Sequence, residues 1–129
     1  MEHQEMRSPL GRAIGLGSAK EGVEHWWRQR LTALALVPLG LWFVATILAH
    51  LGADYEEAIG WLGAPIPAIF MIVLIGVTFY HTALGIQVVI EDYVHQEWVK
   101  LGSLVAVRFC CLLLAVAGIF AVLRIALGG

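Results

Sequence analysis

Three long runs of apolar residues, separated by short polar segments, dominate the chain. The first runs from Leu31 to Ala53 without a charge, and the longest uncharged stretch runs from Ala58 to Ile90. The third, Leu101 to Leu123, contains one charge, Arg108. About 20 apolar residues let a helix cross the hydrocarbon core of a bilayer. The pattern therefore predicts an all-α membrane protein with three transmembrane helices. We expect these helices at about residues 26–52, 65–92 and 99–126.

Proline and tryptophan residues refine these elements. Pro38 falls inside the first run, where neighbouring groups in a membrane protein can compensate for the lost hydrogen bond, so we expect a kink and not a break. Pro65 and Pro67 indicate the start of the second helix, where missing amide hydrogens cost little. Trp26 and Trp27 precede the first run, at the level of lipid headgroups where aromatic side chains collect.

The polar segments predict orientation. Five of the eight basic residues precede the first apolar run, whereas the link over residues 52–64 carries three acids and no basic residue. By the positive-inside rule, the N-terminus is cytoplasmic, and three crossings place the C-terminus outside. Residues 1–22 are interpreted as an irregular N-terminal arm of a single 1–129 membrane-anchor domain, and no cleavable signal is expected. The five basic residues are Arg7, Arg12, Lys20, Arg28 and Arg30.

Composition agrees with a membrane protein. The 129 residues are 60% apolar and 14% charged, with a mean hydropathy of +0.81, whereas soluble domains are about half apolar and a quarter charged. The uneven charge therefore indicates orientation among membrane lipids and not nucleic-acid binding. Cys110 and Cys111 are too few for an iron–sulfur cluster or a structural zinc site, and we expect them to pack as small apolar residues. Three helices enclose little interior, so we expect a larger, multi-subunit helical bundle.

His81 is the first residue that needs a chemical explanation. It lies in the longest uncharged stretch, where an ionisable side chain is costly and usually functional. Gly85, one turn later, leaves space beside the imidazole that a flat macrocycle would need. Imidazole is a common ligand of haem iron, and electron-transfer haems use two axial ligands. Either His81 binds haem iron, or it only makes a hydrogen bond to a neighbouring helix.

If a haem is present, we do not expect this chain to supply both of its axial ligands. His50 is the other histidine inside an apolar run, and it lies 20 residues after Arg30, roughly 30 Å along a helix. His81 is at about half that depth from the same membrane face. The two imidazoles are therefore not expected to meet, and a second ligand would come from a partner chain.

Asp92 and Tyr93 mark the polar end of the second helix, eleven residues beyond His81 and about 16 Å along the axis. A phenol can donate a hydrogen bond to a quinone carbonyl, and a carboxylate can exchange protons with water. The alternative is an ordinary helix end with solvated acids. Arg28 and Arg30 either set orientation or pair with haem propionates, for which arginine is well suited.

Other classes of function remain open from the residues alone. A structural anchor without cofactor would use His81 only for packing. A proton channel or transporter subunit would use His81 and Asp92 as a relay.

The segment HTALGIQVVIEDYVH, residues 81–95, resembles the small hydrophobic membrane-anchor subunits of succinate dehydrogenase, complex II. The family shares a histidine followed eleven residues later by Asp-Tyr. GVEHWWRQRLTA, residues 22–33, is similar to the family's Gly-Val…Arg-x-Thr-Ala segment, and RSPLGRAIGLGSAK, residues 7–20, is similar to the arms of alphaproteobacterial members. Glu91 departs from the family pattern, which leaves open which acid handles protons.

The resemblance implies a subunit of succinate:ubiquinone oxidoreductase in a bacterial inner membrane, with a periplasmic C-terminus. His81 would be one axial ligand of haem b, shared with the larger cytochrome b anchor subunit, and Arg30 would lie near the propionates. Tyr93 and Asp92 would border the ubiquinone site beside the iron–sulfur subunit. Succinate oxidation would belong to the flavoprotein subunit and not to this chain. A fumarate reductase-type anchor is the nearest alternative, because sequence does not set the direction of the reaction.

Overall fold

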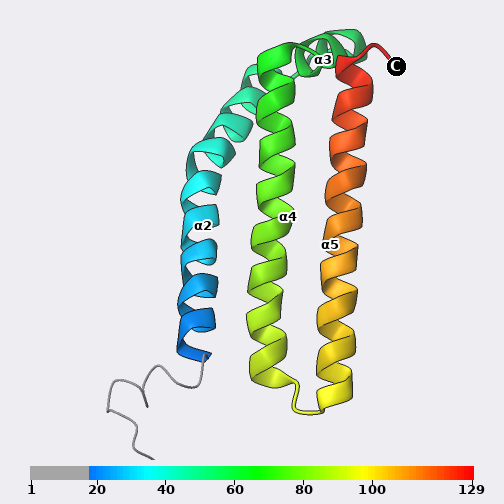
Figure 1. Cartoon of the computed structure of the whole chain (residues 1–129). Coiled ribbons are helices and arrows are strands. Elements are labelled where there is room, and N and C mark those ends of the chain that lie inside the picture. The colour runs from blue at the N-terminus through cyan, green and yellow to red at the C-terminus, as the bar shows by residue number, and fades with distance from the viewer. Residues whose placement is uncertain (1–17) are drawn as a thin grey trace, which may run out of the picture.

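The computed structural model describes residues 18–129 and contains four helices in that range (Figure 1). The expectation of an irregular arm over residues 1–22 falls mostly on residues 1–17, which lie outside the described residues. Residues 18–22 are helical, which corrects that part of the expectation. The helices are α2 (Ser18–Ala49), α3 (Tyr55–Leu62), α4 (Pro65–Tyr93) and α5 (Glu97–Ala126).

The three long helices stand side by side, with α4 in the middle and packed against both α2 and α5 (Figure 1). Each has a segment long and apolar enough to cross a membrane: Gly22–Ala49, Pro65–Tyr93 and Glu97–Ala126. The expected all-α membrane protein with three transmembrane helices is therefore confirmed. The start of α2, the end of α4 and the start of α5 lie at one end of this layer, which we call the α4–α5 turn end. The chain's C-terminus lies at the other end.

Helix α2 is longer at its start than expected and ends at Ala49, three residues before the expected boundary. Pro38 lies inside it without ending it. Figure 1 shows the second half of α2 leaning away from the line of its first half. Proline removes one backbone hydrogen bond and crowds the preceding turn, so a bend at this point has a direct physical cause.

Helix α3 lies in the link over residues 52–64, where the sequence predicted no helix. Asp54 is its N-cap and accepts a hydrogen bond from the backbone N–H of Glu57 at 2.9 Å. Gly52 adopts a φ of +87°, a left-handed conformation that favours glycine and turns the chain out of α2. Trp61 then packs against the rings of Trp42 and His50, with centroids 6.0 and 4.8 Å away. These aromatic contacts fix α3 across the end of the layer opposite the α4–α5 turn.

Close approach of α4 and α5 depends on Gly118. A Cβ atom at this position would lie 3.1 Å from Cγ2 of Ile75, tighter than an ordinary contact. Small residues permit such approach in membrane helices, where dispersion replaces the hydrophobic effect as the packing force. Only Ala68, Leu84 and Val122 are buried among the residues described. Most apolar side chains of the three helices therefore remain available to lipid or to other subunits.

We predict that Gly118→Val destabilises the packing of α4 on α5 by about 1–3 kcal/mol, the typical cost of overpacking. The thermal midpoint of the purified membrane complex should fall accordingly. Gly102→Val is the matched control, because Gly102 lies on the same helix with no described atom within 4 Å of an added Cβ. Equal shifts for the two variants would contradict the importance of the Gly118 contact.

Candidate functional site

The side chain of His81 faces α2 and forms a hydrogen bond there. Its Nδ1 lies 2.7 Å from Oγ1 of Thr32, a residue 49 positions earlier in the chain. Thr32 Oγ1 also lies 2.8 Å from the carbonyl oxygen of Arg28 and 3.0 Å from that of Gln29, on its own helix. The half-buried imidazole is therefore attached to α2 through a hydroxyl that is itself held by the helix backbone.

The other ring nitrogen of His81 is not engaged. Within residues 22–129, the His81 side chain makes one hydrogen bond, at Nδ1. Its Nε2 makes none there and is not one of the buried unpaired atoms, so it remains accessible. Imidazole carries its two nitrogens on different sides of the ring, so a bond at one does not prevent bonding at the other. The hydrogen bond to a neighbouring helix, which was the alternative to a ligand role, is present, and it leaves Nε2 free for a ligand.

Gly85 also faces α2. A Cβ atom added to Gly85 would meet Nε2 of the Gln29 side chain at 3.6 Å, an ordinary van der Waals distance. Two buried polar atoms nearby on α2, Nε2 of His25 and Oε1 of Gln29, have no hydrogen-bond partner among the described residues. The α2 face near Gly85 thus carries unpaired polar atoms that can make further hydrogen bonds.

Asp92 and Tyr93 lie at the α4–α5 turn end, in the last turn of α4. Both side chains are exposed, and Tyr93 retains 78% of its accessible surface. They do not contact His81, because eleven residues of helix separate Asp92 from it, or roughly 16 Å. Asp92 and Tyr93 therefore lie at the end of α4, whereas His81 lies near its middle.

Arg30 does not lie beside His81 in this structure. Its guanidinium carbon is 4.8 Å from the centroid of the Trp26 ring, on the same helix. Two residues separate Arg30 from Thr32, which rotates it about 200° around the helix axis, away from α4. Arg28 instead turns toward the middle of the layer, where it pairs loosely with Glu24 at 3.7 Å.

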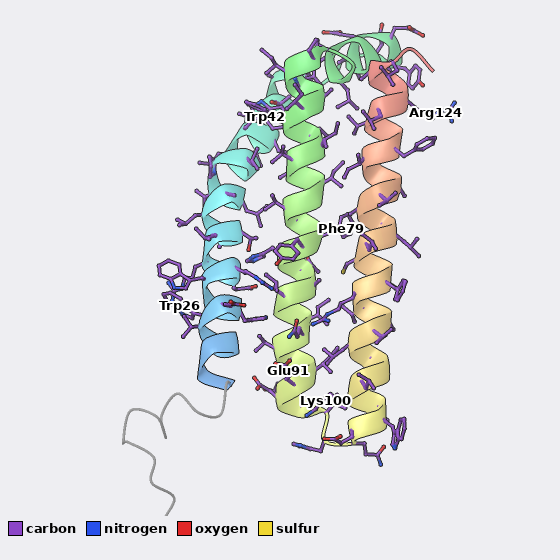
Figure 2. The ribbon with its side chains drawn as sticks, viewed as in Figure 1. Trp26, Trp42, Phe79, Glu91, Lys100 and Arg124 are labelled. Carbon is purple, nitrogen blue, oxygen red and sulfur yellow. The ribbon has the colours of Figure 1, made fainter. Side chains whose placement is uncertain are left out.

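A cavity of about 670 Å³ opens between α2, α4 and α5. Arg28 and Arg108 line its polar end, and Arg108 donates to Oε1 of Gln87 at 3.1 Å. Gln87 in turn donates to Glu91 at 3.0 Å, so Glu91 receives a bond that links it indirectly to the cation of α5. Figure 2 shows Glu91 near the lower end of α4. The residues that line this cavity do not include His81.

His50 occupies the opposite end of the layer. Its Nδ1 donates to the carbonyl of Thr46 at 2.9 Å, and its ring packs on Trp61. His50 and His81 therefore do not meet, as the sequence predicts. The thiols of Cys110 and Cys111 are free, with Cys110 exposed and Cys111 half-buried.

The described part of the chain does not form a metal centre by itself. Residues 22–129 bring no three His, Cys, Asp or Glu side chains together in a metal-binding group. A metal ligand from His81 would therefore need further ligands from outside these residues. Thr32 was not singled out as a site residue from the sequence, although it belongs to the Arg-x-Thr-Ala segment quoted there.

Comparison with known proteins agrees with these features. The family model described as succinate dehydrogenase/fumarate reductase transmembrane subunit matches residues 4–121. A succinate dehydrogenase hydrophobic membrane anchor subunit of Rickettsia bellii (strain RML369-C) is 37% identical over 118 residues, covering 92% of this chain and 94% of the relative. The subunit of the same name from Paracoccus denitrificans is 31% identical over 121 residues, covering 94% and 93%. No solved structure gives a significant match. The chain therefore belongs to the family of succinate dehydrogenase and fumarate reductase transmembrane subunits, as a membrane-anchor subunit of succinate dehydrogenase.

Proposed function

We propose that this anchor subunit co-binds a b-type haem through His81 and contributes Tyr93 and Asp92 to a ubiquinone-reduction site. The observation that carries the proposal is the state of the His81 ring, which is half-buried in a membrane span with Nδ1 bonded and Nε2 free. The relatives' names favour succinate oxidation over fumarate reduction as the direction. Succinate itself would be oxidised by a flavoprotein subunit and not by this chain.

The residues around His81 fit a haem. A metal-bound histidine almost always donates its second ring N–H to a nearby acceptor, which holds the ring and tunes its basicity. Thr32 Oγ1 occupies the position of that acceptor, 2.7 Å from Nδ1. When bound, the haem supplies one-electron transfer. Because this chain offers one imidazole at that depth, the second axial ligand would come from the larger cytochrome b anchor subunit.

A role for Arg30 near the propionates stays a prediction, and it requires the side chain to change its position. Its side chain now lies over Trp26, and it would have to turn from that ring to reach a carboxylate beside His81. Cation–π contacts at exposed sites are worth about 0.5–1 kcal/mol, so an ion pair with a propionate can replace one. Gly85 would serve as a small residue beside the macrocycle.

Tyr93 and Asp92 suit a quinone site at the membrane boundary. Quinone reduction consumes two electrons and two protons, and both side chains are exposed where protons are available. The phenol of Tyr93 would donate a hydrogen bond to the quinone carbonyl, and Asp92 would relay protons from water. Glu91 is a less direct candidate because it already accepts a bond from Gln87.

Orientation and partners complete the proposal. The excess of basic residues before the first span supports a cytoplasmic N-terminus and a periplasmic C-terminus in a bacterial inner membrane. The α4–α5 turn end, with Asp92 and Tyr93, would then face the cytoplasm. An iron–sulfur subunit docked there would deliver electrons to the quinone, with the flavoprotein attached to it.

We predict that His81→Ala weakens haem retention by more than the roughly 10- to 100-fold that loss of a supporting partner costs a metal site, because it removes the ligand itself. The measurement is the absorption spectrum of the purified complex after extensive washing. His50→Ala is the matched control, since His50 packs on Trp61 at the other end of the layer. Full haem absorbance in His81→Ala would reject the ligand role and favour a haem-free structural anchor.

We predict that Tyr93→Phe slows ubiquinone reduction several-fold, because the variant loses one hydrogen bond worth about 0.5–1.5 kcal/mol. Succinate oxidation by a soluble artificial acceptor should be unchanged. Tyr55→Phe is the control, because Tyr55 is an equally exposed tyrosine, on α3. Parallel losses in both assays of Tyr93→Phe would indicate damage to assembly and argue against a quinone-site role.

A further inference from the structure

The hydroxyl of Thr32 stands between three potential partners. Its Oγ1 lies 2.8 Å from the Arg28 carbonyl oxygen, 3.0 Å from the Gln29 carbonyl oxygen and 2.7 Å from Nδ1 of His81. A threonine hydroxyl has one hydrogen to donate and two lone pairs with which to accept. The direction of that one hydrogen therefore decides which nitrogen of a neutral imidazole carries the ring hydrogen.

The two carbonyl groups settle the direction of donation. Carbonyl oxygens only accept hydrogen bonds, so an Oγ1 held this close to both would be repelled unless its hydrogen pointed toward one of them. Threonine within a helix commonly makes this back-bond to the carbonyl three or four residues earlier. With its hydrogen committed to α2, Thr32 can only accept from His81. In a neutral imidazole, Nδ1 of His81 then carries the hydrogen and Nε2 carries the lone pair.

We infer that Thr32 is a positioning residue for His81, which holds the imidazole in the tautomer whose Nε2 can bind iron. This inference rests on the proposed haem-binding function. The backbone of α2 fixes the hydroxyl, the hydroxyl fixes Nδ1–H, and the lone pair of Nε2 points away from that hydrogen bond. A ring that rotated freely, or carried its hydrogen on Nε2, would have to reorganise before it could bind iron.

The contact also tunes the ligand. A hydrogen bond from Nδ1–H to an acceptor makes the imidazole a stronger electron donor to a metal at Nε2. The Thr32 oxygen is a good acceptor because its own hydrogen is polarised toward a backbone carbonyl, and chains of such bonds strengthen one another. Stronger donation favours ferric over ferrous iron. Loss of the hydroxyl should therefore raise the midpoint potential of the haem.

The test is Thr32→Val in the intact, purified complex, since valine keeps the shape of threonine and removes the hydroxyl. We expect haem to be released roughly 10- to 100-fold more readily, as for other losses of a ligand's supporting partner. We also expect a positive shift of the haem midpoint potential. The g values of the ferric haem in electron paramagnetic resonance should change, because they depend on the orientation of the imidazole planes. Thr32→Ser keeps a hydroxyl and should restore all three properties.

Thr82→Val is the matched control. Thr82 is next to His81 on α4 and makes the same type of back-bond, from Oγ1 to the Thr78 carbonyl at 2.8 Å, but its side chain is exposed and its hydroxyl is bonded to its own helix instead of to the imidazole. It should leave the spectrum and potential unchanged. If Thr32→Val does not assemble, Thr32→Ala removes the same hydroxyl with less bulk and is measured in the same way.

The outcomes separate this inference from the proposed function. Haem lost in His81→Ala but retained in Thr32→Val with unchanged potential and g values would overturn the role of Thr32 alone. Thr32→Ser behaving like Thr32→Val would also overturn it, because the hydroxyl would then not be the relevant group. Full haem in His81→Ala would instead reject the ligand assignment on which both rest.

Discussion

The hydrogen bond between His81 and Thr32 is the constraint on which the candidate site depends. Water is absent from the hydrocarbon core, so a polar side chain there must find its partner within protein. The 2.7 Å contact supplies that partner and ties α4 to α2 at the depth of the imidazole. It uses one ring nitrogen only. The same contact that makes a membrane histidine tolerable therefore leaves it able to coordinate a metal.

Polar side chains lie at different depths along the three long helices. The α4–α5 turn end carries the exposed Asp92 and Tyr93, and beside them the bonded series from Arg108 through Gln87 to Glu91. The opposite end is closed by α3, whose Trp61 packs on Trp42 and His50. Between these ends the helices expose many large apolar side chains, while the half-buried His81 lies against α2. Under the proposed function, electron and proton transfer would therefore use the polar α4–α5 turn end and the imidazole of His81.

Much of the fold was predictable because bilayer thickness imposes the length of each span. The three apolar runs therefore located α2, α4 and α5, and the position of Pro38 within a long run indicated that the helix continues. The short helix α3 was missed because eight residues are below the length at which a helix is stable by itself. Its signal was present in the Asp54 cap and the acids of its first turn, but its stability comes from contacts with Trp42 and His50 that only the fold brings together.

The candidate site was predictable only in part. Helical spacing places His81, Gly85 and Asp92 on related faces of one helix, so a single sequence suffices for them. The hydrogen bond between Thr32 and His81 joins positions 49 residues apart. It depends on how α2 and α4 are aligned along their axes, and the residue pattern within one helix does not predict that alignment. The direction of Arg30 has the same origin: once Thr32 faces α4, a residue two positions earlier must face elsewhere.

A single imidazole has a consequence for how a haem site could form. Under the proposed function, this chain contributes one axial ligand already oriented by α2, and a complete pair of ligands exists only when another anchor subunit docks beside it. A ligand that binds the assembled state and not the separate chains stabilises the assembly by mass action. Haem binding and subunit association would then be one coupled equilibrium. The small, open layer of α2, α4 and α5 suits this role, since it buries little by itself and leaves its apolar surface for the partner that completes the site.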